Sequence, residues 1–296
     1  MNDQRQNIAF IVGFGYIGEL IAQAALREKQ EVKALIRSEN KIQQLEQLGI
    51  AFTIADLDQH TGQQLPINHL SDVFYTTPPQ PDGETDTRLR YFLSLLDEPP
   101  ASLIYISTSG VYGDYQGAWV TEDDPLKSTS PRSLQRIDAE NTLLEWHAQH
   151  PETHLVILRS AGIYGPHRLP VDRLKRQAPL VKQDELHAYL NLIHGEDLSR
   201  ICRRATSRCK SGEKYNVSDG SPTTMVDYLN HVAEQLELPQ APLVSLAEAH
   251  KTISPSMMKY LSESKRLSNK KLLSTLQEDL LYPNYIEGVK QAAREK

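Results

Sequence analysis

The motif Gly13-x-Gly15-x-x-Gly18 constrains the fold of this chain more than any other stretch of its sequence. Residues 8–12 are all apolar, as in a strand buried on both faces, and apolar residues recur at helical spacing after the motif. In such a strand–turn–helix unit, Gly13 permits the tight turn, Gly15 lets a pyrophosphate approach the backbone, and Gly18 lets the helix pack on its strand. The free N–H groups at the start of the helix then face the phosphates. The motif therefore predicts a dinucleotide-binding unit.

The residue that follows the second predicted strand bears on which dinucleotide is bound. Residues 31–36 read as that strand, and Arg37 and Ser38 come where an acidic residue would hold the ribose hydroxyls of NAD. A guanidinium can instead bind a 2′-phosphate through two hydrogen bonds. The pattern favours NADP as the cofactor; an arginine facing solvent, with Glu39 close by, keeps NAD as the alternative.

Further strands are predicted at 50–54, 72–76 and 103–106, each ending at the carboxyl edge where ligands bind in doubly wound sheets. Asp56, just after the third strand, can reach the adenine amino group or cap a turn. The residues expected at the cofactor from this region and from the glycine motif are Gly13, Phe14, Gly15, Tyr16, Ile17, Gly18, Arg37, Ser38, Asp56, Leu57, Thr76, Thr77 and Pro78.

Composition limits the partners. A net charge of −6 argues against a nucleic-acid partner, which usually requires a basic face. No apolar run approaches the roughly 20 residues of a membrane span, and no signal-peptide pattern is present, so we expect a cytoplasmic protein without a membrane partner. Cys202 and Cys209 suit neither a disulfide scaffold nor a zinc site, and no metal site is expected.

Several motifs in order along the chain resemble those of the extended short-chain dehydrogenase/reductases, also called NAD-dependent epimerase/dehydratases. With the glycine motif they cover nearly the whole sequence. They are Ser107-Thr-Ser-Gly-Val-Tyr-Gly113, Leu158-Arg-Ser-Ala-Gly-Ile-Tyr-Gly-Pro166, Ile193-His-Gly-Glu-Asp197, Tyr215-Asn-Val217 and Ser264-Lys-Arg-Leu-Ser-Asn269.

This resemblance implies an α/β fold, a Rossmann-type doubly wound parallel sheet with a smaller, mainly helical C-terminal substrate lobe. It places residues 1–165 in the dinucleotide-binding domain, to which 186–220 return, and 166–185 with 221–296 in the substrate lobe. It also implies hydride transfer between nicotinamide and a small-molecule substrate, usually a nucleotide-sugar.

The resemblance assigns Thr108 to the hydroxyl that hydrogen-bonds the reacting oxygen, four residues before the tyrosine of the Val-Tyr-Gly turn. The family's catalytic Tyr and Lys lie eight and four residues before a Glu; here Ala139-Glu140 puts Arg132 and Arg136 at those positions. An arginine stays protonated and cannot act as a general acid or base. Arg136 could still bind ribose hydroxyls, and Arg132 could bind a substrate carboxylate or phosphate, or face solvent.

A displaced proton donor is one way to replace the missing tyrosine. Tyr112, Tyr115 and Tyr164 are candidates, with Tyr164 following a predicted strand end; aromatic packing around the cleft is the favoured alternative.

Other residues are placed by the resemblance alone. It puts Ser107, Ser160 and Ile163 beside the cofactor. Arg168 belongs to a basic run that suits an anionic substrate or a solvated loop, and His194, with Asp197, is expected to fasten the returning chain near the substrate pocket.

Two functions follow from these observations. The first is an NADP-dependent oxidoreductase or epimerase, favoured by Thr108 and a complete second lobe. The second is an NADP(H) sensor without turnover, favoured by the missing tyrosine. Helices predicted at 84–96 and 131–147 pair in many dimers of the family, and Trp146 would suit such an interface, so a homodimer is favoured.

Overall fold

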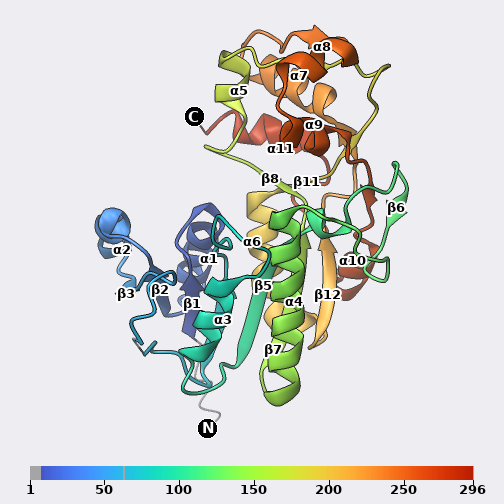
Figure 1. Cartoon of the computed structure of the whole chain (residues 1–296). Coiled ribbons are helices and arrows are strands. Elements are labelled where there is room, and N and C mark those ends of the chain that lie inside the picture. The colour runs from blue at the N-terminus through green and yellow to red at the C-terminus, as the bar shows by residue number, and fades with distance from the viewer. Residues whose placement is uncertain (1–7, 63, 296) are drawn as a thin grey trace. The chain divides into compact units, whose positions relative to one another are not determined.

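The computed structural model describes residues 8–62 and 64–295, which form two compact units (Figure 1). The first unit comprises the described residues of Met1–Val111, together with Thr129–Arg159 and Leu198–Tyr215. The second comprises Tyr112–Ser128, Ser160–Asp197 and the described part of Asn216–Lys296.

A seven-stranded sheet organises the first unit, in the order β12-β7-β5-β4-β1-β2-β3. Strand β1 pairs in parallel with both β2 and β4, so the strand order reverses beside it, as in the predicted doubly wound fold. Val12 lies opposite both Leu35 and Tyr75, and the chain therefore leaves all three strands at one level. The strands are β1 (Ile8–Val12), β2 (Val32–Ile36), β3 (Ala51–Ile54), β4 (Ser71–Tyr75), β5 (Ser102–Thr108), β7 (His154–Ser160) and β12 (Glu213–Val217).

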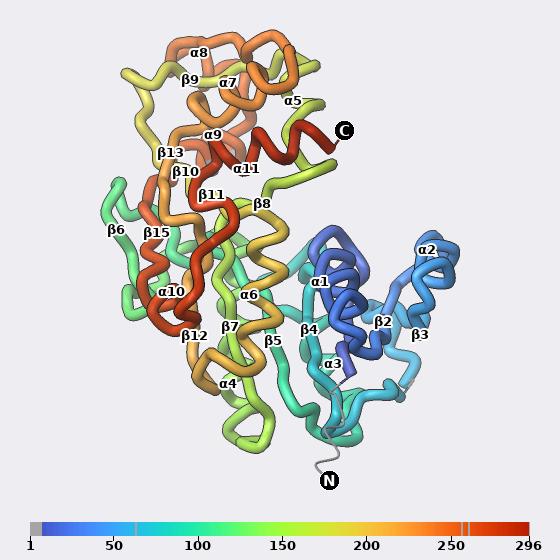
Figure 2. The backbone as a smooth tube through the Cα atoms, turned by 180° about the vertical axis from the view of Figure 1, so that it is seen from behind, coloured from blue at the N-terminus to red at the C-terminus, as the bar shows by residue number. Residues whose placement is uncertain are grey.

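Helices cover both faces of this sheet. In Figure 1 α3 and α4 lie in front of it, and the reverse view in Figure 2 shows α1 and α6 on the other face. The Asp86 side chain caps α3 by accepting from the Leu89 N–H, and Ser130 caps α4. The helices are α1 (Tyr16–Arg27), η1 (Glu39–Lys41), α2 (Ile42–Gln47), α3 (Thr87–Ser94), η2 (Ser109–Tyr112), α4 (Pro131–Gln149) and α6 (Gly195–Arg208).

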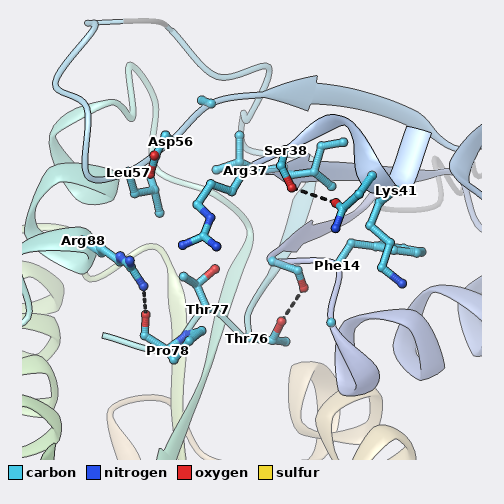
Figure 3. A pocket seen from close by; sticks show the side chains of 16 residues that line it. Phe14, Arg37, Ser38, Lys41, Asp56, Leu57, Thr76, Thr77, Pro78 and Arg88 are labelled. Carbon is cyan, nitrogen blue, oxygen red and sulfur yellow. Dashed lines mark hydrogen bonds between the residues drawn. The ribbon is translucent and has the colours of Figure 1, made fainter. Parts of the chain in front are cut away.

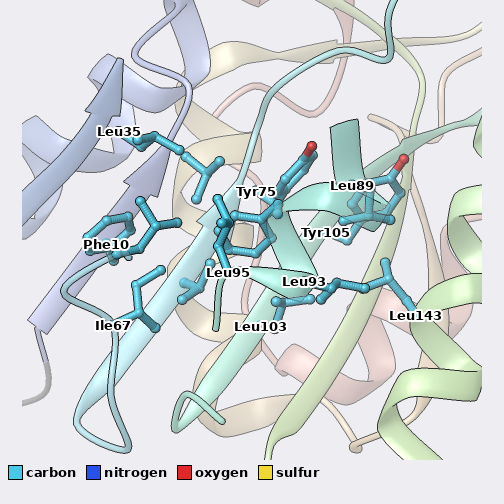
Figure 4. Close-up of a cluster of buried hydrophobic side chains, with 14 of the residues drawn as sticks. Phe10, Leu35, Ile67, Tyr75, Leu89, Leu93, Leu95, Leu103, Tyr105 and Leu143 are labelled. Carbon is cyan, nitrogen blue, oxygen red and sulfur yellow. The ribbon is translucent and has the colours of Figure 1, made fainter. Parts of the chain in front are cut away.

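The core of the first unit lies between the sheet and α3 and α4 (Figure 4). Tyr75 and Tyr105 come from adjacent strands, and Leu89 and Leu143 come from α3 and α4; all four are fully buried. Their removal from water supplies the main driving force for closing this face. The apolar spacing predicted for 84–96 thus marks the buried face of α3.

The second unit is built mainly from helices around its own core. Tyr164, Leu192, Leu229 and Val289 are buried there. A Cβ atom at Gly288 would lie 2.1 Å from the Tyr164 hydroxyl, so only glycine fits beneath that ring. The helices are α5 (Val171–Lys175), α7 (Met225–Gln235), α8 (Leu246–Thr252), α9 (Pro255–Ser262), α10 (Lys270–Leu276) and α11 (Tyr285–Ala292).

Short strand pairs join distant segments of the second unit. β8 (Gly162–Tyr164) pairs with β11 (Leu192–His194), and β6 (Trp119–Val120) pairs with β15 (Arg266–Leu267). Residues 112–128, 160–165, 186–197 and 216–220 fall in the second unit, whereas the predicted dinucleotide-binding domain includes them; the predicted boundaries stay a prediction. The remaining short strands are β9 (Leu180–Val181), β10 (Tyr189–Leu190), β13 (Thr223–Thr224) and β14 (Leu243–Val244).

None of the helices in the described part of the chain is both long and apolar enough to cross a membrane.

Candidate functional site

A pocket of about 310 Å³ opens at the carboxyl ends of β1 to β4 in the first unit (Figure 3). Ten residues predicted at the cofactor line it: Gly13, Phe14, Gly15, Arg37, Ser38, Asp56, Leu57, Thr76, Thr77 and Pro78. Six residues that were not predicted complete the lining: Leu35, Ile36, Asn40, Lys41, Ala55 and Arg88.

Two hydroxyl groups from the segment after β4 hold the glycine turn in place. Thr76 Oγ1 donates to the Gly13 carbonyl at 2.6 Å, and Thr77 Oγ1 donates to the Val12 carbonyl at 3.1 Å. Gly13 has a φ of +93°, and a Cβ atom there would lie 2.5 Å from Thr77 Oγ1. Only glycine satisfies both conditions.

The open space beside Gly15 leaves room for a ligand. A Cβ atom at Gly15 would meet nothing within 4 Å, and α1 begins at Gly15 without a side-chain cap. The first N–H groups of α1 can therefore bind phosphate oxygens. Tyr16, Ile17 and Gly18 do not line the pocket. Gly18 packs on the sheet, because a Cβ there would lie 2.3 Å from the Gly13 carbonyl oxygen.

The end of the pocket beside β2 is cationic. Arg37 is exposed, makes no hydrogen bond to any described residue, and directs its guanidinium toward Thr77 among the lining side chains (Figure 3). Lys41 Nζ lies 2.9 Å from Gln44 Oε1 and 3.9 Å from Glu19 Oε2. Ser38 Oγ donates to Asn40 Oδ1 at 2.7 Å. This end thus offers two positive charges, a hydroxyl and an amide to a ligand.

The opposite end carries Asp56 and Arg88. Asp56 Oδ1 accepts from the Asp58 N–H at 3.0 Å, so this carboxylate caps a turn and lines the pocket at the same time. Arg88, from α3, is buried and pairs with Asp58. Hydrogen bonding to Arg88 holds the pKa of Asp58 below its usual value, which keeps the carboxylate ionised.

Thr108 ends β5 with its hydroxyl at a turn. Its Oγ1 accepts from the Gly110 N–H at 3.1 Å, and Ser133 Oγ donates to the Gly110 carbonyl at 3.1 Å. No described residue accepts the Thr108 hydroxyl proton, which is therefore available to a substrate oxygen. Ser107 differs from the expected cofactor contact: its side chain is buried and donates to Glu140 Oε1 at 2.6 Å, inside the first unit.

The two arginines at the positions of the missing catalytic pair behave differently. Arg132 is exposed on the first turn of α4, which is compatible with both alternatives, a substrate anion or solvent. Arg136 is half-buried and donates through Nη1 to the Tyr105 hydroxyl at 2.8 Å and the Ile106 carbonyl at 3.2 Å. These two acceptors on β5 hold that nitrogen of Arg136 inside the first unit, and its expected contact with ribose hydroxyls stays a prediction.

The three tyrosines considered as displaced proton donors each donate to a fixed acceptor in the second unit. Tyr112 Oη bonds to Asn216 Oδ1 at 2.7 Å, and Tyr115 Oη bonds to the Pro125 carbonyl at 2.6 Å. Tyr164 lies in the core, where its Oη donates to the Asn284 carbonyl at 3.4 Å and burial raises its pKa. These contacts are those expected of the packing alternative, and a role as proton donor stays a prediction.

The expected fastening role fits His194 and Asp197. His194 is buried, and its Nε2 lies 3.1 Å from Gln291 Oε1; burial lowers its pKa, which favours the neutral ring. Both carboxylate oxygens of Asp197 accept backbone N–H groups, from Leu281 at 2.8 Å and from Tyr282 at 2.9 Å. These bonds tie the start of α6 to the segment before α11.

Three other predicted residues also lie in the second unit. Ser160 is buried and donates to the Ala161 carbonyl at 3.1 Å. Ile163 is half-buried in β8, and the exposed Arg168 donates through Nε to its carbonyl at 3.2 Å.

A buried carboxyl group in the second unit predicts a pH-dependent stability. Asp219 Oδ1 accepts from the Ser221 N–H at 2.9 Å, Oδ2 has no hydrogen-bond partner among the described residues, and burial raises the pKa to about 7. An unfolded Asp titrates near pH 3.9, so the folded chain binds the extra proton between about pH 4 and 7. The stability contributed by the protonated form is therefore lost as the pH rises through 7.

We expect Asp219→Asn to be nearly neutral at pH 4 and to stabilise the chain at pH 8 by on the order of 2 kcal/mol. Urea unfolding at both pH values measures this difference, with the exposed Asp184→Asn as control. Equal pH slopes for wild type and Asp219→Asn would rule out a role for this carboxyl.

Comparison with known proteins supports one family. Residues 84–218 match the model of the NAD dependent epimerase/dehydratase family. A dTDP-glucose 4,6-dehydratase from Streptomyces griseus is 30% identical over 129 residues, which are 41% of this chain and 39% of that protein. The matched segment thus spans about two fifths of this relative.

Similar solved structures extend over almost the whole chain. A functionally unknown conserved protein from Silicibacter pomeroyi DSS superposes with a TM-score of 0.83 at 26% identity, covering 97% of this chain and 98% of the other. A dTDP-glucose 4,6-dehydratase from Bacillus anthracis, solved in complex with NAD, superposes with a TM-score of 0.74 at 15% identity, covering 97% and 96%. At that identity the second likeness shows the shared fold alone.

Proposed function

We propose that the chain, which matches the NAD dependent epimerase/dehydratase family model over residues 84–218, binds NADP(H) in the first-unit pocket. It would use this cofactor to oxidise or reduce a small anionic alcohol or carbonyl compound. A nucleotide-sugar is the substrate class that its relatives suggest, because dTDP-glucose and UDP-glucose appear in the names of similar proteins. The family match and the pocket support this proposal together.

The observation that carries the cofactor choice is the pair of cations at the end of β2. Arg37 and Lys41 both line the pocket there, and the Glu39 carboxylate does not. A 2′-phosphate would gain charge-assisted hydrogen bonds from this end, whereas the unphosphorylated ribose of NAD would lack the acidic partner that usually holds it.

The remaining residues fit a nicotinamide dinucleotide. The N–H groups at the start of α1 would bind the pyrophosphate, and Asp56 would accept from the adenine amino group. Hydride transfer is the chemistry that the bound nicotinamide would supply. Thr108 would orient the reacting oxygen through its free hydroxyl proton.

A sensor without turnover is the second candidate function. The exposed Arg132, the inward-turned Arg136 and the occupied hydroxyls of the three tyrosines all favour it. Incubation with NADP and a panel of nucleotide-sugars, with both the nucleotide and the sugar assayed, separates the two functions. An oxidoreductase forms NADPH, an epimerase alters the sugar and regenerates NADP, and a sensor does neither.

Where turnover is found, Thr108→Ala is expected to lower kcat by about 100-fold while the NADP dissociation constant stays nearly unchanged, because the hydroxyl acts mainly in the transition state. Thr108→Ser keeps the hydroxyl and should retain most of the activity. Assays of NADPH formation measure kcat, and calorimetry measures the NADP dissociation constant. Undiminished turnover in Thr108→Ala would show that this residue does not orient the substrate.

A further inference from the structure

We propose that Arg88 is a positioning residue that fixes the adenine end of the pocket; this inference rests on the proposed binding of NADP(H). Arg88 belongs to α3, is only 7% exposed and lines the pocket. It holds together the two loops that form the walls of that end, one following β3 and the other following β4.

The first wall is held through Asp58. Arg88 Nε donates to Asp58 Oδ1 at 2.7 Å, and Nη2 donates to Oδ2 at 2.5 Å, which is the two-pronged geometry that guanidinium and carboxylate favour. Asp58 lies two residues after Asp56, whose carboxylate accepts its N–H. The position of Asp56 in the pocket therefore depends on the same turn that Arg88 fixes.

The second wall is held through backbone carbonyls. Arg88 Nη1 donates to Pro78 at 3.0 Å and to Pro79 at 3.2 Å. Neither proline has an N–H of its own to anchor the loop, so the guanidinium supplies bonds that the backbone cannot. The bond to Pro78 is drawn in Figure 3, where Arg88 lies below Asp56 and Leu57.

Four hydrogen bonds from the Arg88 side chain thus hold the loop after β3 and the loop after β4 at a fixed distance from each other. A preformed slot binds a planar base without the cost of ordering its walls. The effect of Arg88 should be the same for every ligand that carries adenosine, whether or not it carries a 2′-phosphate. Arg37, at the cationic end, should instead affect only ligands that carry this phosphate.

Calorimetric titration with ADP-ribose and with 2′-phospho-ADP-ribose tests this assignment. Arg88→Met should weaken the binding of both ligands by the same factor, roughly 10-fold, because the loosened walls must then be ordered on binding. Arg88→Lys keeps the charge but not the two-pronged geometry, and should restore part of the affinity. Asp58→Asn should lower the affinity for both ligands by one and the same factor.

Arg90 provides the matched control. It lies two residues along α3 and pairs in the same two-pronged way with Asp138, but it does not line the pocket. Arg90→Met should leave both affinities within about twofold of wild type. Thermal unfolding of each variant measures how much stability the loss of the ion pair costs. A loss of stability alone would not produce an affinity that rises in steps from Met to Lys to Arg at position 88.

The outcomes are distinguishable. If wild type binds neither ligand, the proposed function fails and this inference fails with it. If wild type binds both ligands, and if Arg88→Met and Asp58→Asn bind them as tightly as wild type does, only the positioning role is overturned. A loss in Arg88→Met confined to the 2′-phosphorylated ligand would also overturn it, because Arg88 would then be a phosphate contact.

Discussion

Glu140→Ala is expected to lower the free energy of unfolding by about 3–5 kcal/mol, because it removes the carboxylate that is paired with a buried guanidinium. The Glu140 and Arg159 side chains are 1% and 3% exposed, and Arg159 Nη2 lies 2.7 Å from Glu140 Oε2. Ser107 Oγ donates to the same carboxylate. The pair joins α4 to β7 and to the end of β5, next to Thr108. Urea unfolding monitored by circular dichroism measures the loss.

Two controls separate the buried charge from other effects. Asp138→Asn, on the same helix, alters an ion pair whose Arg90 side chain is 48% exposed, and it should cost less than about 1 kcal/mol. The double variant Glu140→Leu with Arg159→Met removes both charges and should recover most of the stability. A change below 1 kcal/mol in Glu140→Ala would mean that Arg159 reaches solvent or another anion.

The second large effect concerns the cationic end of the pocket. Arg37→Ala combined with Lys41→Ala is expected to weaken NADP binding by about 2–6 kcal/mol, the sum of two charge-assisted contacts, and to leave NAD binding nearly unchanged. Arg37→Ala alone should cost about 1–3 kcal/mol for NADP. Isothermal titration calorimetry of both cofactors with each variant measures these differences.

Lys33→Ala is a suitable control, because Lys33 lies on β2 and pairs with Glu31 but does not line the pocket. It should change neither affinity by more than about 0.5 kcal/mol. Equal losses of NADP and NAD in the double variant would show that these cations bind a part of the cofactor common to both. The preference for NADP would then have no basis.

The sequence alone was sufficient for the features that depend on backbone geometry. Gly13 and Gly18 meet atoms that exclude a Cβ, so the glycine spacing reports a three-dimensional requirement directly. Parallel strands separated by helices then predict the carboxyl edge as the ligand site. Ten residues predicted at the cofactor line the pocket for this reason.

Side-chain direction and distant pairing could not be read in the same way. Arg88 reaches Asp58, thirty residues earlier in the chain, and nothing in the apolar pattern of α3 distinguishes it from Arg90. Arg136 turns toward Tyr105 because a buried hydroxyl and a carbonyl accept its protons, a competition that spacing does not reveal. The pairing of β6 with β15 could not be predicted, because two-residue strands carry too little sequence pattern.

Lys41 shows an intermediate case. The short turn η1, which precedes α2, brings it to the pocket. A lysine four residues after Arg37 could have been recognised as a second cation at the same strand end. The homodimer remains a prediction. Trp146 is half-buried, and the centroid of its ring lies 4.6 Å from that of His150.

The most direct test of the central claim is a calorimetric titration of the wild-type chain with NADP and, separately, with NAD. The pocket predicts saturable binding of one NADP per chain, with a dissociation constant at least about 10-fold lower than that of NAD. The absence of saturable binding of either nucleotide would contradict the account, because the glycine turn and the cationic end of β2 would then hold no dinucleotide.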